Sequence, residues 1–455
     1  MNPPHVIVIG GGPAGIQAAL AAALAGARTT LVHQTPIGGR AGWHSLLPSK
    51  VWLTAAEAAD LFHGAPDLGF QVAAPPVVDP PGLLARLQRV AESWNTAQHR
   101  RLANAGVCLV QGRASLVSAT EIQVLDPEGE EVARMEGDAI IVATGSIPIF
   151  PPEMRPDGER ILAPRFARHM RRLPQSTIVV GAGVTGSEFA YLFSALGVQV
   201  TWVIDEFGVL PTFAPEAGEF LKQELVRRGV RTVEGQRAVS AQPGPGGVVV
   251  RLMDGQELHA EQAFVAIGRI PDLDDLDLAN AGISDGRSGL CLDEYGRSTV
   301  APSLYFVGDA TGMPMVANRA MHQGWIAGRH AAGAPVPPFR PETVVAAVYT
   351  EPQIAQVGRV DDSPDAASIT LPLAEGLRAH LLPHGDGFVK LVYRPDSGVV
   401  LGGLAVGPHA AELLTPLAVA LEQGMAVHRL AGLFPSHPTL GEVLFQAARR
   451  AGRGR

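Results

Sequence analysis

One pattern of hydrophobic and polar positions occurs twice along this 455-residue chain. Residues 5–9 form a largely apolar run that leads into a glycine cluster and an alanine-rich segment, residues 16–25. Residues 176–180 lead in the same way into a second glycine cluster and a helical pattern over residues 187–196. Short apolar runs of this kind predict buried strands, and a second such run follows each helix, at residues 29–32 and 199–203. Strand, glycine turn, helix and strand predict a βαβ unit in both places.

Two proline-rich breaks divide the rest of the chain, at residues 148–152 and 333–338. Beyond the second break, β-like runs alternate with helical patterns. The β-like runs are residues 388–393 and 399–406, and the helical patterns are residues 410–423 and 441–450. This alternation predicts an α+β domain at the C-terminal end.

Both glycine clusters have the spacing of a dinucleotide-binding turn. Gly10 permits the tight turn, Gly12 allows a pyrophosphate to approach the backbone, and Gly15 allows helix and strand to pack closely. The N-terminus of the helix then offers free N–H groups and the positive end of its dipole to the phosphates. We therefore expect two dinucleotide sites, one at Gly10, Gly12, Pro13, Ala14 and Gly15 and one at Gly181, Gly183, Val184 and Gly186.

The residue expected to meet the ribose is unusual in both units. A carboxylate normally stands at the end of the second strand. His33 holds this position in the first unit, whereas in the second unit Ile204 holds it and Asp205 and Glu206 follow. An acidic cluster without an arginine would repel a 2′-phosphate, so the second unit favours NADH over NADPH.

Composition and charge narrow the function classes. The net charge of −8 argues against a nucleic-acid-binding protein, which normally has a basic face. Only two cysteines, Cys108 and Cys291, are present, so we expect no disulfide framework and a cytoplasmic location. No stretch approaches 18 uninterrupted apolar residues, which predicts no membrane insertion. No spacing of histidine, cysteine or acidic residues indicates a metal site.

Six further segments carry a resemblance to a known family. They are residues 143–146 (ATGS), 266–271 (AIGRIP), 305–309 (YFVGD), 315–317 (MVA), 349–352 (YTEP) and 387–391 (GFVKL). With the two glycine turns, they make essentially the whole chain similar to the class I pyridine nucleotide-disulfide oxidoreductases. The resemblance implies an enzyme that binds FAD and NAD(P)H and works as a homodimer.

The resemblance also implies an architecture. It is an α/β protein with two Rossmann-like domains, the NAD(P) domain being inserted into the FAD domain, and a C-terminal α+β dimerisation domain. We expect the FAD domain at residues 1–147 and 275–335, the NAD(P) domain at 148–274 and the dimerisation domain at 336–455. The expected cofactor contacts are completed by His33, Gly39, Arg40, Lys50, Thr144, Gly145, Asp205, Gly268, Gly308, Asp309, Met315, Val316 and Ala317.

The redox motif of the family is altered in this chain. The family pattern reads GGTCxxxxCxPSK, whereas residues 38–50 read GGRAGWHSLLPSK, with Ala41 and Leu46 in place of the two cysteines. Neither Cys108 nor Cys291 stands at an equivalent position. Disulfide reduction through an internal dithiol is therefore not available.

Two side-chain pairs of the family machinery remain. Lys50 matches the lysine beside the reactive flavin nitrogen, and Glu188 matches the glutamate that pairs with it. His437 and Glu442 match a family dyad whose histidine enters the active site of the partner subunit. In this chain the dyad could protonate an acceptor, or it could be a structural relic. Trp43 lies in the altered segment and could stack on a planar acceptor or pack the loop.

These features predict direct electron transfer from NAD(P)H through FAD to a small external acceptor, a quinone or a similar planar molecule. Three alternatives stay open. The acceptor could be a second nicotinamide, as in soluble transhydrogenase. It could be a dithiol or disulfide that the substrate itself supplies, as in dihydrolipoamide dehydrogenase. The chain could also be an electron-transfer subunit that needs a protein partner.

Overall fold

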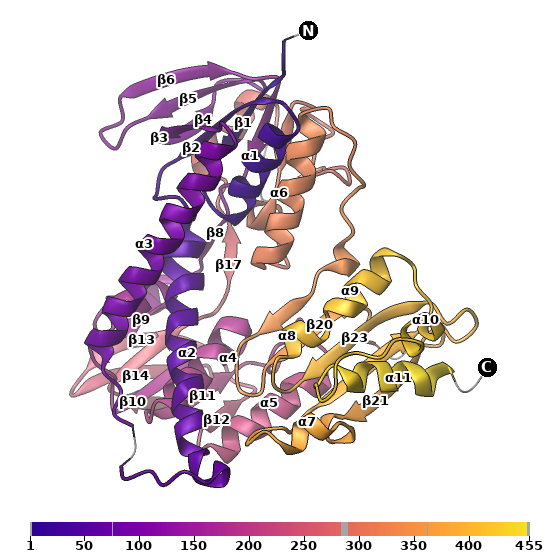
Figure 1. Ribbon diagram of the computed structural model, residues 1–455. Coiled ribbons are helices and arrows are strands. Elements are labelled where there is room, and N and C mark those ends of the chain that lie inside the picture. The colour runs from indigo at the N-terminus through magenta and orange to yellow at the C-terminus, as the bar shows by residue number, and fades with distance from the viewer. Residues whose placement is uncertain (1, 75, 284–289, 362, 453–455) are drawn as a thin grey trace. The chain divides into compact units, whose positions relative to one another are not determined.

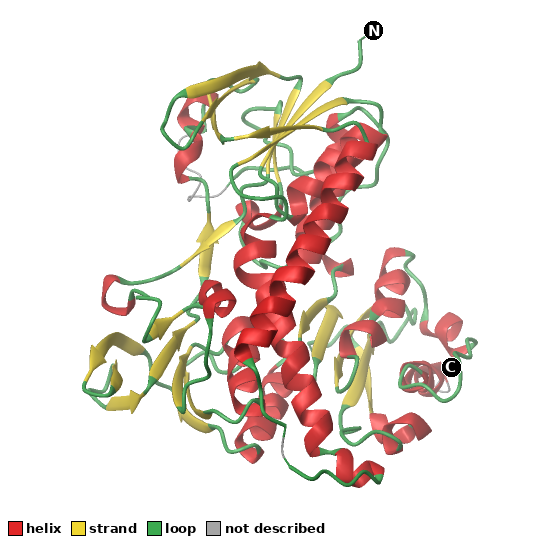
Figure 2. Ribbon diagram, turned by 60° about the vertical axis from the view of Figure 1, so that its left-hand side comes forward, coloured by secondary structure: helices red, strands yellow, loops and turns green. Residues whose placement is uncertain are grey.

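The computed structural model describes residues 2–74, 76–283, 290–361 and 363–452 (Figures 1 and 2). The chain forms two compact units. The first unit comprises residues 1–48, 85–149 and 269–340, and the second comprises residues 49–84, 150–268 and 341–455. The three domain boundaries expected from the sequence stay a prediction.

The first unit is built on a five-stranded parallel sheet in the order β18-β7-β1-β2-β3. Its strands are β1 (His5–Ile9), β2 (Arg28–His33), β3 (Cys108–Gln111), β7 (Ala139–Val142) and β18 (Leu304–Phe306). All five residues of β1 are buried, because helices and further strands cover both faces of a parallel sheet. The strand predicted at residues 5–9 is confirmed.

Helix α1 (Pro13–Leu24) crosses from β1 to β2 and packs against α6 (Ala317–Ala331). Alanines make up half of α1, and two glycines of α6 face it. A Cβ at Gly324 or Gly328 would collide with the backbone carbonyl oxygens of Ala14 or Ala18. The two helices can therefore approach each other only because both present small residues.

Smaller elements complete the first unit. A three-stranded antiparallel sheet contains β4 (Arg113–Leu116), β5 (Glu121–Leu125) and β6 (Glu131–Glu136). A two-stranded ribbon contains β8 (Ser146–Pro148) and β17 (Arg269–Pro271). Two long helices, α2 (Leu46–His63) and α3 (Pro80–Asn104), contribute residues to both units.

The second unit repeats the plan with a parallel sheet in the order β12-β11-β10-β16-β9. Its strands are β9 (Ile161–Leu162), β10 (Ser176–Val180), β11 (Gln199–Ile204), β12 (Arg231–Glu234) and β16 (Gln262–Val265). Helix α4 (Val184–Ala195) connects β10 to β11, and α5 (Pro215–Arg227) connects β11 to β12. A three-stranded antiparallel sheet follows, with β13 (Ala238–Gly244), β14 (Gly247–Leu252) and β15 (Glu257–Ala260).

The C-terminal part of the second unit is an antiparallel sheet with helices. The sheet has the order β19-β20-β23-β22-β21, with β19 (Ala346–Val348), β20 (Ile354–Gly358), β21 (Ala367–Pro372), β22 (Phe388–Tyr393) and β23 (Val400–Val406). Its helices are α7 (Leu377–His380), α8 (Ala410–Leu413), α9 (Thr415–Glu422), α10 (Val427–Ala431) and α11 (Glu442–Gly452).

The single helix predicted over residues 410–423 is wrong in one respect, because it is divided into α8 and α9. Pro416 explains the division, since it has no N–H to donate to the carbonyl four residues earlier. Within the described ranges of the chain, no helix is both long enough and apolar enough to cross a membrane.

Candidate active site and nucleotide-binding turns

The first glycine turn lies between β1 and α1 and has the predicted division of roles. Gly10 has φ 113°, which favours glycine, and Gly15 could not carry a Cβ without colliding with the Gly10 carbonyl oxygen. A Cβ at Gly12, in contrast, would meet no protein atom within 4 Å. Gly12 is the N-cap of α1, so the backbone there is open to an anion approaching the helix N-terminus.

The second glycine turn has the same geometry between β10 and α4. Gly181 has φ 104°, and a Cβ at Gly186 would collide with the Gly181 carbonyl oxygen. Gly183 is the N-cap of α4, and a Cβ there would again meet nothing within 4 Å. The indole N–H of Trp202, on the neighbouring strand β11, donates to the Gly181 carbonyl oxygen at 3.0 Å and holds the turn in place.

Several expected cofactor contacts gather at the carboxyl ends of the first sheet. Thr144 follows β7, and its buried Oγ1 has no hydrogen-bond partner among the described residues. The neighbouring Gly145 has φ 79° and space for a Cβ. Arg40 donates to the Thr144 carbonyl oxygen at 2.9 Å and forms an ion pair with Asp272. A buried hydroxyl without a partner, next to an open glycine turn, fits a polar ligand such as a flavin nucleotide.

Asp309 is held at the same edge by a short chain of hydrogen bonds. The Ser146 hydroxyl donates to Asp309 Oδ2 at 2.6 Å and accepts from Arg269 Nε at 2.8 Å. Burial lowers the pKa of Arg269, and the charge of Asp309 opposes this shift. Arg319 is also buried, and it donates to the carbonyl oxygens of Gly312 and Pro314. Ser146, Arg269 and Arg319 were not among the expected site residues.

The remaining expected contacts of this group lie on adjacent segments. Gly308 follows β18 and donates its N–H to Gln323 Oε1 at 2.9 Å. Val316 is the N-cap of α6, so Met315, Val316 and Ala317 lead into that helix. Gly268 precedes β17 and belongs to the second unit.

His33 ends β2 beside the first glycine turn. Its Nδ1 lies 2.9 Å from the Thr35 carbonyl oxygen, so the ring is tied to the loop that follows it. That loop is joined to the turn, because Gly38 donates its N–H to the Gly11 carbonyl oxygen at 2.7 Å. Gly39 lies so close that a Cβ there would be 2.9 Å from Gly12 Cα. The structure therefore brings His33 and Gly39 together at the turn, and their contact with a cofactor stays a prediction.

The segment with the altered redox motif is filled by aromatic side chains. Residues 41–45 form a single π-helical turn, and the Trp43 indole N–H donates to the Ile37 carbonyl oxygen at 2.9 Å. Trp94 of α3 packs on Gly38 so tightly that a Cβ at Gly38 would collide with its ring. Asn95 donates to the same Ile37 carbonyl oxygen at 2.9 Å. Trp43 thus packs the loop, and Trp94 is a partner that the sequence reasoning missed.

Lys50 and Glu188 form a close ion pair in the second unit. Lys50 Nζ donates to both carboxylate oxygens of Glu188, at 2.7 and 2.8 Å, and the glutamate is buried. The Tyr349 backbone N–H donates to Glu188 Oε1 at 3.0 Å, and its ring centroid lies 4.6 Å from Lys50 Nζ. Tyr349 therefore holds both partners, a role that its place in the 349–352 motif could have suggested.

A second charged group surrounds the next turns of α4. The Tyr191 hydroxyl donates to Asp60 Oδ2 at 2.9 Å, and Arg228 Nη1 donates to both Asp60 oxygens at 2.9 and 2.8 Å. Burial, followed by the charge of Asp60, raises the pKa of Tyr191. Burial raises the pKa of Glu351 to about 7, although the charge of Arg228 opposes the shift. The surroundings of α4 thus combine buried acids with two cations.

An arginine from another segment lies beside the acidic residues that follow β11, which corrects the expectation of a cluster without arginine. Arg237, which precedes β13, donates from Nε to Glu206 Oε2 at 2.8 Å, and its guanidinium carbon lies 5.4 Å from the Phe207 ring centroid. The acidic cluster at Asp205 and Glu206 is therefore not free of arginine. Only the fold brings Arg237 here, so no local pattern could have indicated it.

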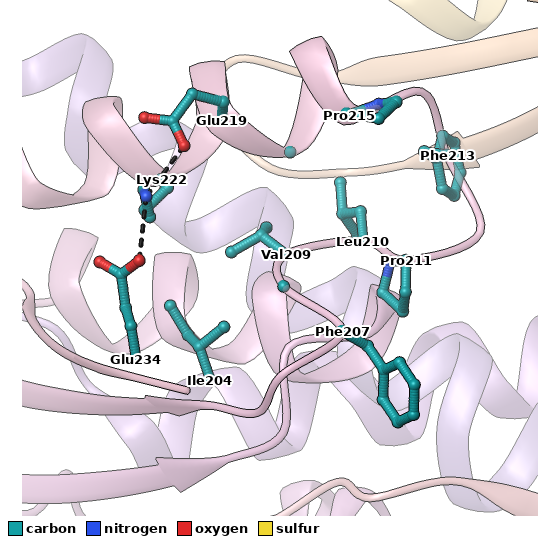
Figure 3. Close-up of a pocket in the computed structure, with 12 residues that line it drawn as sticks. Ile204, Phe207, Val209, Leu210, Pro211, Phe213, Pro215, Glu219, Lys222 and Glu234 are labelled. Carbon is teal, nitrogen blue, oxygen red and sulfur yellow. Dashed lines mark hydrogen bonds and ion pairs between the residues drawn. The ribbon is translucent and has the colours of Figure 1, made fainter. Parts of the chain in front are cut away.

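A cavity of about 230 Å³ adjoins this strand end (Figure 3). Most of its lining residues are apolar, and Ile204, Val209 and Leu210 are among them. Lys222 lies at one side between Glu219 and Glu234, with ion-pair distances of 2.9 and 3.0 Å. Both carboxylates thus neutralise the one cation that lines the cavity.

His437 and Glu442 form the expected dyad. His437 Nδ1 lies 2.9 Å from Glu442 Oε2, and Glu442 Oε1 accepts from the Thr439 backbone N–H at 2.6 Å. These bonds, that of His437 first, hold the pKa of Glu442 below its usual range. The histidine side chain is 65% exposed within this chain. In the described part of the chain, no cluster of three or more His, Cys, Asp or Glu residues could hold a metal ion.

Comparisons with known proteins agree with this geometry. Residues 4–324 match the family model described as pyridine nucleotide-disulphide oxidoreductase, and residues 344–448 match the dimerisation domain of that family. A Mycobacterium tuberculosis protein named NAD(P)H dehydrogenase (quinone) is 36% identical, over 98% of this chain and 93% of the relative. Dihydrolipoyl dehydrogenase 2 of Haloarcula marismortui is 34% identical, over 98% and 96%. The crystal structure of LpdA from Mycobacterium tuberculosis is similar with a TM-score of 0.92 and 35% identity, covering 98% of this chain and 99% of that one.

Proposed function

The chain belongs to the pyridine nucleotide-disulphide oxidoreductase family and is an FAD-containing NAD(P)H oxidoreductase, and from this premise we propose that it passes electrons directly to an external quinone. One observation carries the proposal. Ala41 and Leu46 stand where the family has its redox cysteines, and the two cysteines that the chain does have, Cys108 and Cys291, are exposed and unpaired. No internal dithiol can therefore relay electrons to a disulfide substrate.

A quinone is an acceptor that needs no thiol relay, because reduced flavin can transfer electrons to it directly. A relative of almost the same length is named for this activity and shares 36% of its residues with the chain. Trp43 lies in the segment that the cysteines would span, and the Trp94 ring of α3 packs against Gly38 and Gly42. We propose that the acceptor binds beside this segment.

Our proposal assigns the FAD to the first unit and the nicotinamide nucleotide to the second. The turn at Gly10, Gly12 and Gly15 would hold the FAD pyrophosphate, with Thr144 and Asp309 at the same sheet edge. The turn at residues 181–186 would hold the nicotinamide nucleotide. When bound, FAD supplies a two-electron acceptor for the nicotinamide hydride and a donor for the acceptor molecule.

Lys50 is proposed to stabilise the reduced flavin by its positive charge, as the family motif implies. Glu188 acts as the positioning residue, because both of its oxygens accept from Lys50 Nζ. Tyr349 fixes Glu188 through its backbone N–H and contacts Lys50 with its ring. The ammonium group is thus held by three contacts within the second unit.

NADH is proposed as the preferred reductant, since Asp205 and Glu206 would repel a 2′-phosphate. We also propose that the enzyme is a homodimer, because residues 344–448 match the dimerisation domain of the family. A cytoplasmic location is consistent with two unpaired cysteines in the chain.

Anaerobic stopped-flow reduction tests the proposal. The purified FAD protein is mixed with NADH or NADPH, and the reduced protein is then mixed with a quinone, a lipoyl disulfide, a nicotinamide analogue or oxygen. We expect rapid bleaching of the flavin by NADH and rapid reoxidation by the quinone. A flavin that stays oxidised with both nucleotides, or a reduced flavin that only another acceptor reoxidises, contradicts the proposal.

A second candidate function is reduction of a substrate that brings its own dithiol to the flavin. The His437–Glu442 pair, at 2.9 Å, supports it, because such a dyad can accept and return a thiol proton. His437→Ala separates the two candidates. If this variant loses activity with a lipoyl substrate and keeps full activity with a quinone, the dyad serves the dithiol reaction.

A further inference from the structure

We propose that the ion pair between Glu206 and Arg237 sets the choice between the two nicotinamide nucleotides. Glu206 keeps Arg237 engaged, so that the arginine does not receive the 2′-phosphate of NADPH. The inference rests on the proposed nucleotide site at residues 181–186 and deepens it, because it assigns a specificity-determining pair to that site.

The fold places this pair at the ribose end of the second unit. Strands β11 and β12 are parallel neighbours, so their carboxyl ends, Ile204 and Glu234, lie at one edge of the sheet. The Gln236 backbone N–H donates to the Ile204 carbonyl oxygen at 3.3 Å, which anchors the segment after β12 to the end of β11. Arg237 follows directly. In a dinucleotide-binding unit, this edge is where an acidic residue meets the ribose or an arginine meets a 2′-phosphate.

Two nitrogen atoms of Arg237 contact the two carboxylate oxygens of Glu206. Nε donates to Oε2 at 2.8 Å, and Nη2 pairs with Oε1, which makes the contact bidentate. The hydrogen bonds from Arg237 lower the pKa of Glu206, and the same bonds raise the pKa of Arg237, so both groups are charged at neutral pH. A bidentate carboxylate occupies the face of the guanidinium fork that a phosphate would use.

The surroundings oppose a phosphate while the pair is intact. Asp205 stands next to Glu206, and its Oδ1 accepts from the Phe207 backbone N–H at 3.1 Å. A 2′-phosphate would meet two carboxylates and one arginine that is already neutralised. A free 2′-hydroxyl, in contrast, can donate to a carboxylate here.

The pair is accessible and easily released. Both side chains are 49% exposed, and the Phe207 ring beneath Arg237 is 65% exposed. An exposed ion pair contributes little to stability, so its removal leaves the fold intact. Glu206→Gln removes one repelling charge and frees Arg237 in a single step.

The test compares NADH and NADPH in four proteins, namely the parent, Glu206→Gln, the double variant Glu206→Gln/Arg237→Gln, and Glu257→Gln. The last is a matched control, since Glu257 forms a similarly exposed pair with Arg251 on the β14–β15 sheet, at 2.6 Å. Steady-state kcat/KM is measured for both nucleotides. Binding of adenosine 2′,5′-bisphosphate and of AMP is measured by calorimetry, which does not depend on the redox reaction.

We expect Glu206→Gln to raise the NADPH to NADH ratio of kcat/KM about tenfold to a hundredfold, the range of a charged hydrogen bond. The affinity for adenosine 2′,5′-bisphosphate relative to AMP should rise in parallel. The double variant should lose most of this gain, and Glu257→Gln should match the parent.

Three results would overturn the inference: no gain in Glu206→Gln, an equal gain in the double variant, or an equal gain in Glu257→Gln. The second would mean that lost repulsion alone is responsible. If neither nucleotide reduces the parent flavin, the proposed function fails, yet the calorimetric comparison still decides the inference. If NADH reduces the flavin normally and Glu206→Gln gains nothing, only the inference fails.

Discussion

The two βαβ units have nearly the same backbone turn and very different helices behind it. In the first unit, half of the residues of α1 are alanine, and the helix packs against glycines of α6. In the second unit, α4 carries Glu188 and Tyr191, both buried and both engaged by charged partners. A shared glycine geometry therefore suits both units to a nucleotide, while the helix that follows the second turn carries buried polar side chains with charged partners.

The carboxyl ends of β2 and β11, the second strands of the two βαβ units, also differ in their charged side chains. His33 closes β2 with a hydrogen bond to its own loop. The end of β11 has Asp205, Glu206 and Arg237 within one exposed cluster. The end of β2 is thus held by a hydrogen bond within its own loop, and the end of β11 adds charged side chains. Four predictions test this contrast, from the largest expected effect to the smallest.

The first prediction tests the glycine turn that both units share, by means of Gly15→Ala and Gly186→Ala. In each case the new Cβ would collide with a backbone carbonyl oxygen, of Gly10 or Gly181, which cannot move without opening the turn. We expect each change to lower the free energy of unfolding by more than about 3 kcal/mol, measured by urea denaturation. Gly15→Ala should also abolish FAD retention.

Gly183→Ala is the matched control, because a Cβ there meets no protein atom within 4 Å. It should denature like the parent and keep its FAD, and the KM for NADH should rise about tenfold or more, since the methyl group would stand where the pyrophosphate approaches. Equal stability losses in Gly183→Ala and Gly186→Ala would contradict the division of roles within the turn.

The charge network is tested by Lys50→Met, which removes the ammonium donor to buried Glu188 and leaves the hydrogen bond from the Tyr349 backbone N–H in place. Removing one member of a largely buried pair should lower the free energy of unfolding by about 2 kcal/mol. Flavin reduction by NADH should slow about tenfold to a hundredfold, as measured by anaerobic stopped flow.

Lys50→Met/Glu188→Gln separates the two effects. The double variant should recover most of the stability, because no uncompensated charge remains, yet its flavin should still be reduced slowly. Recovery of the rate together with the stability would mean that Lys50 acts only in folding.

Glu351 gives the second unit a pH dependence. Its pKa is about 7 in the folded protein against an ordinary value of 4.5, so the folded state keeps a proton that the unfolded chain releases. Stability should therefore fall as the pH rises from about 4.5 to about 7 and stay level above that. Glu351→Gln should remove this fall and raise the free energy of unfolding at pH 8 by about 1–2 kcal/mol. Exposed Glu159→Gln serves as the control and should leave the pH profile of unfolding as it is in the parent.

The smallest effect concerns Tyr349→Leu. This variant keeps the backbone N–H to Glu188 and removes the ring 4.6 Å from Lys50 Nζ. A cation–π contact at such a site contributes about 0.5–1 kcal/mol, so flavin reduction should slow about twofold to fivefold. Tyr349→Phe should retain the parent rate. If flavin reduction slows as much in Tyr349→Phe as in Tyr349→Leu, the effect comes from the hydroxyl group and not from the ring.

Local sequence determined the two βαβ units, because their glycines act on neighbouring backbone through spacing alone. The strands at residues 5–9 and 176–180 and both turns could be predicted for that reason. The change in the redox segment could also be found from the sequence, since Ala41 and Leu46 stand inside one short motif.

Contacts between distant residues were decided only by the tertiary structure. Arg237 reaches Glu206 because β11 and β12 are adjacent, and Trp94 reaches Gly38 because α3 returns along the first unit. The prediction of an acidic cluster without arginine came from a short stretch of chain, in which Arg237 does not occur. Backbone spacing is a local property of the sequence, whereas the charge that a ligand meets is summed over every segment that the fold brings to the site.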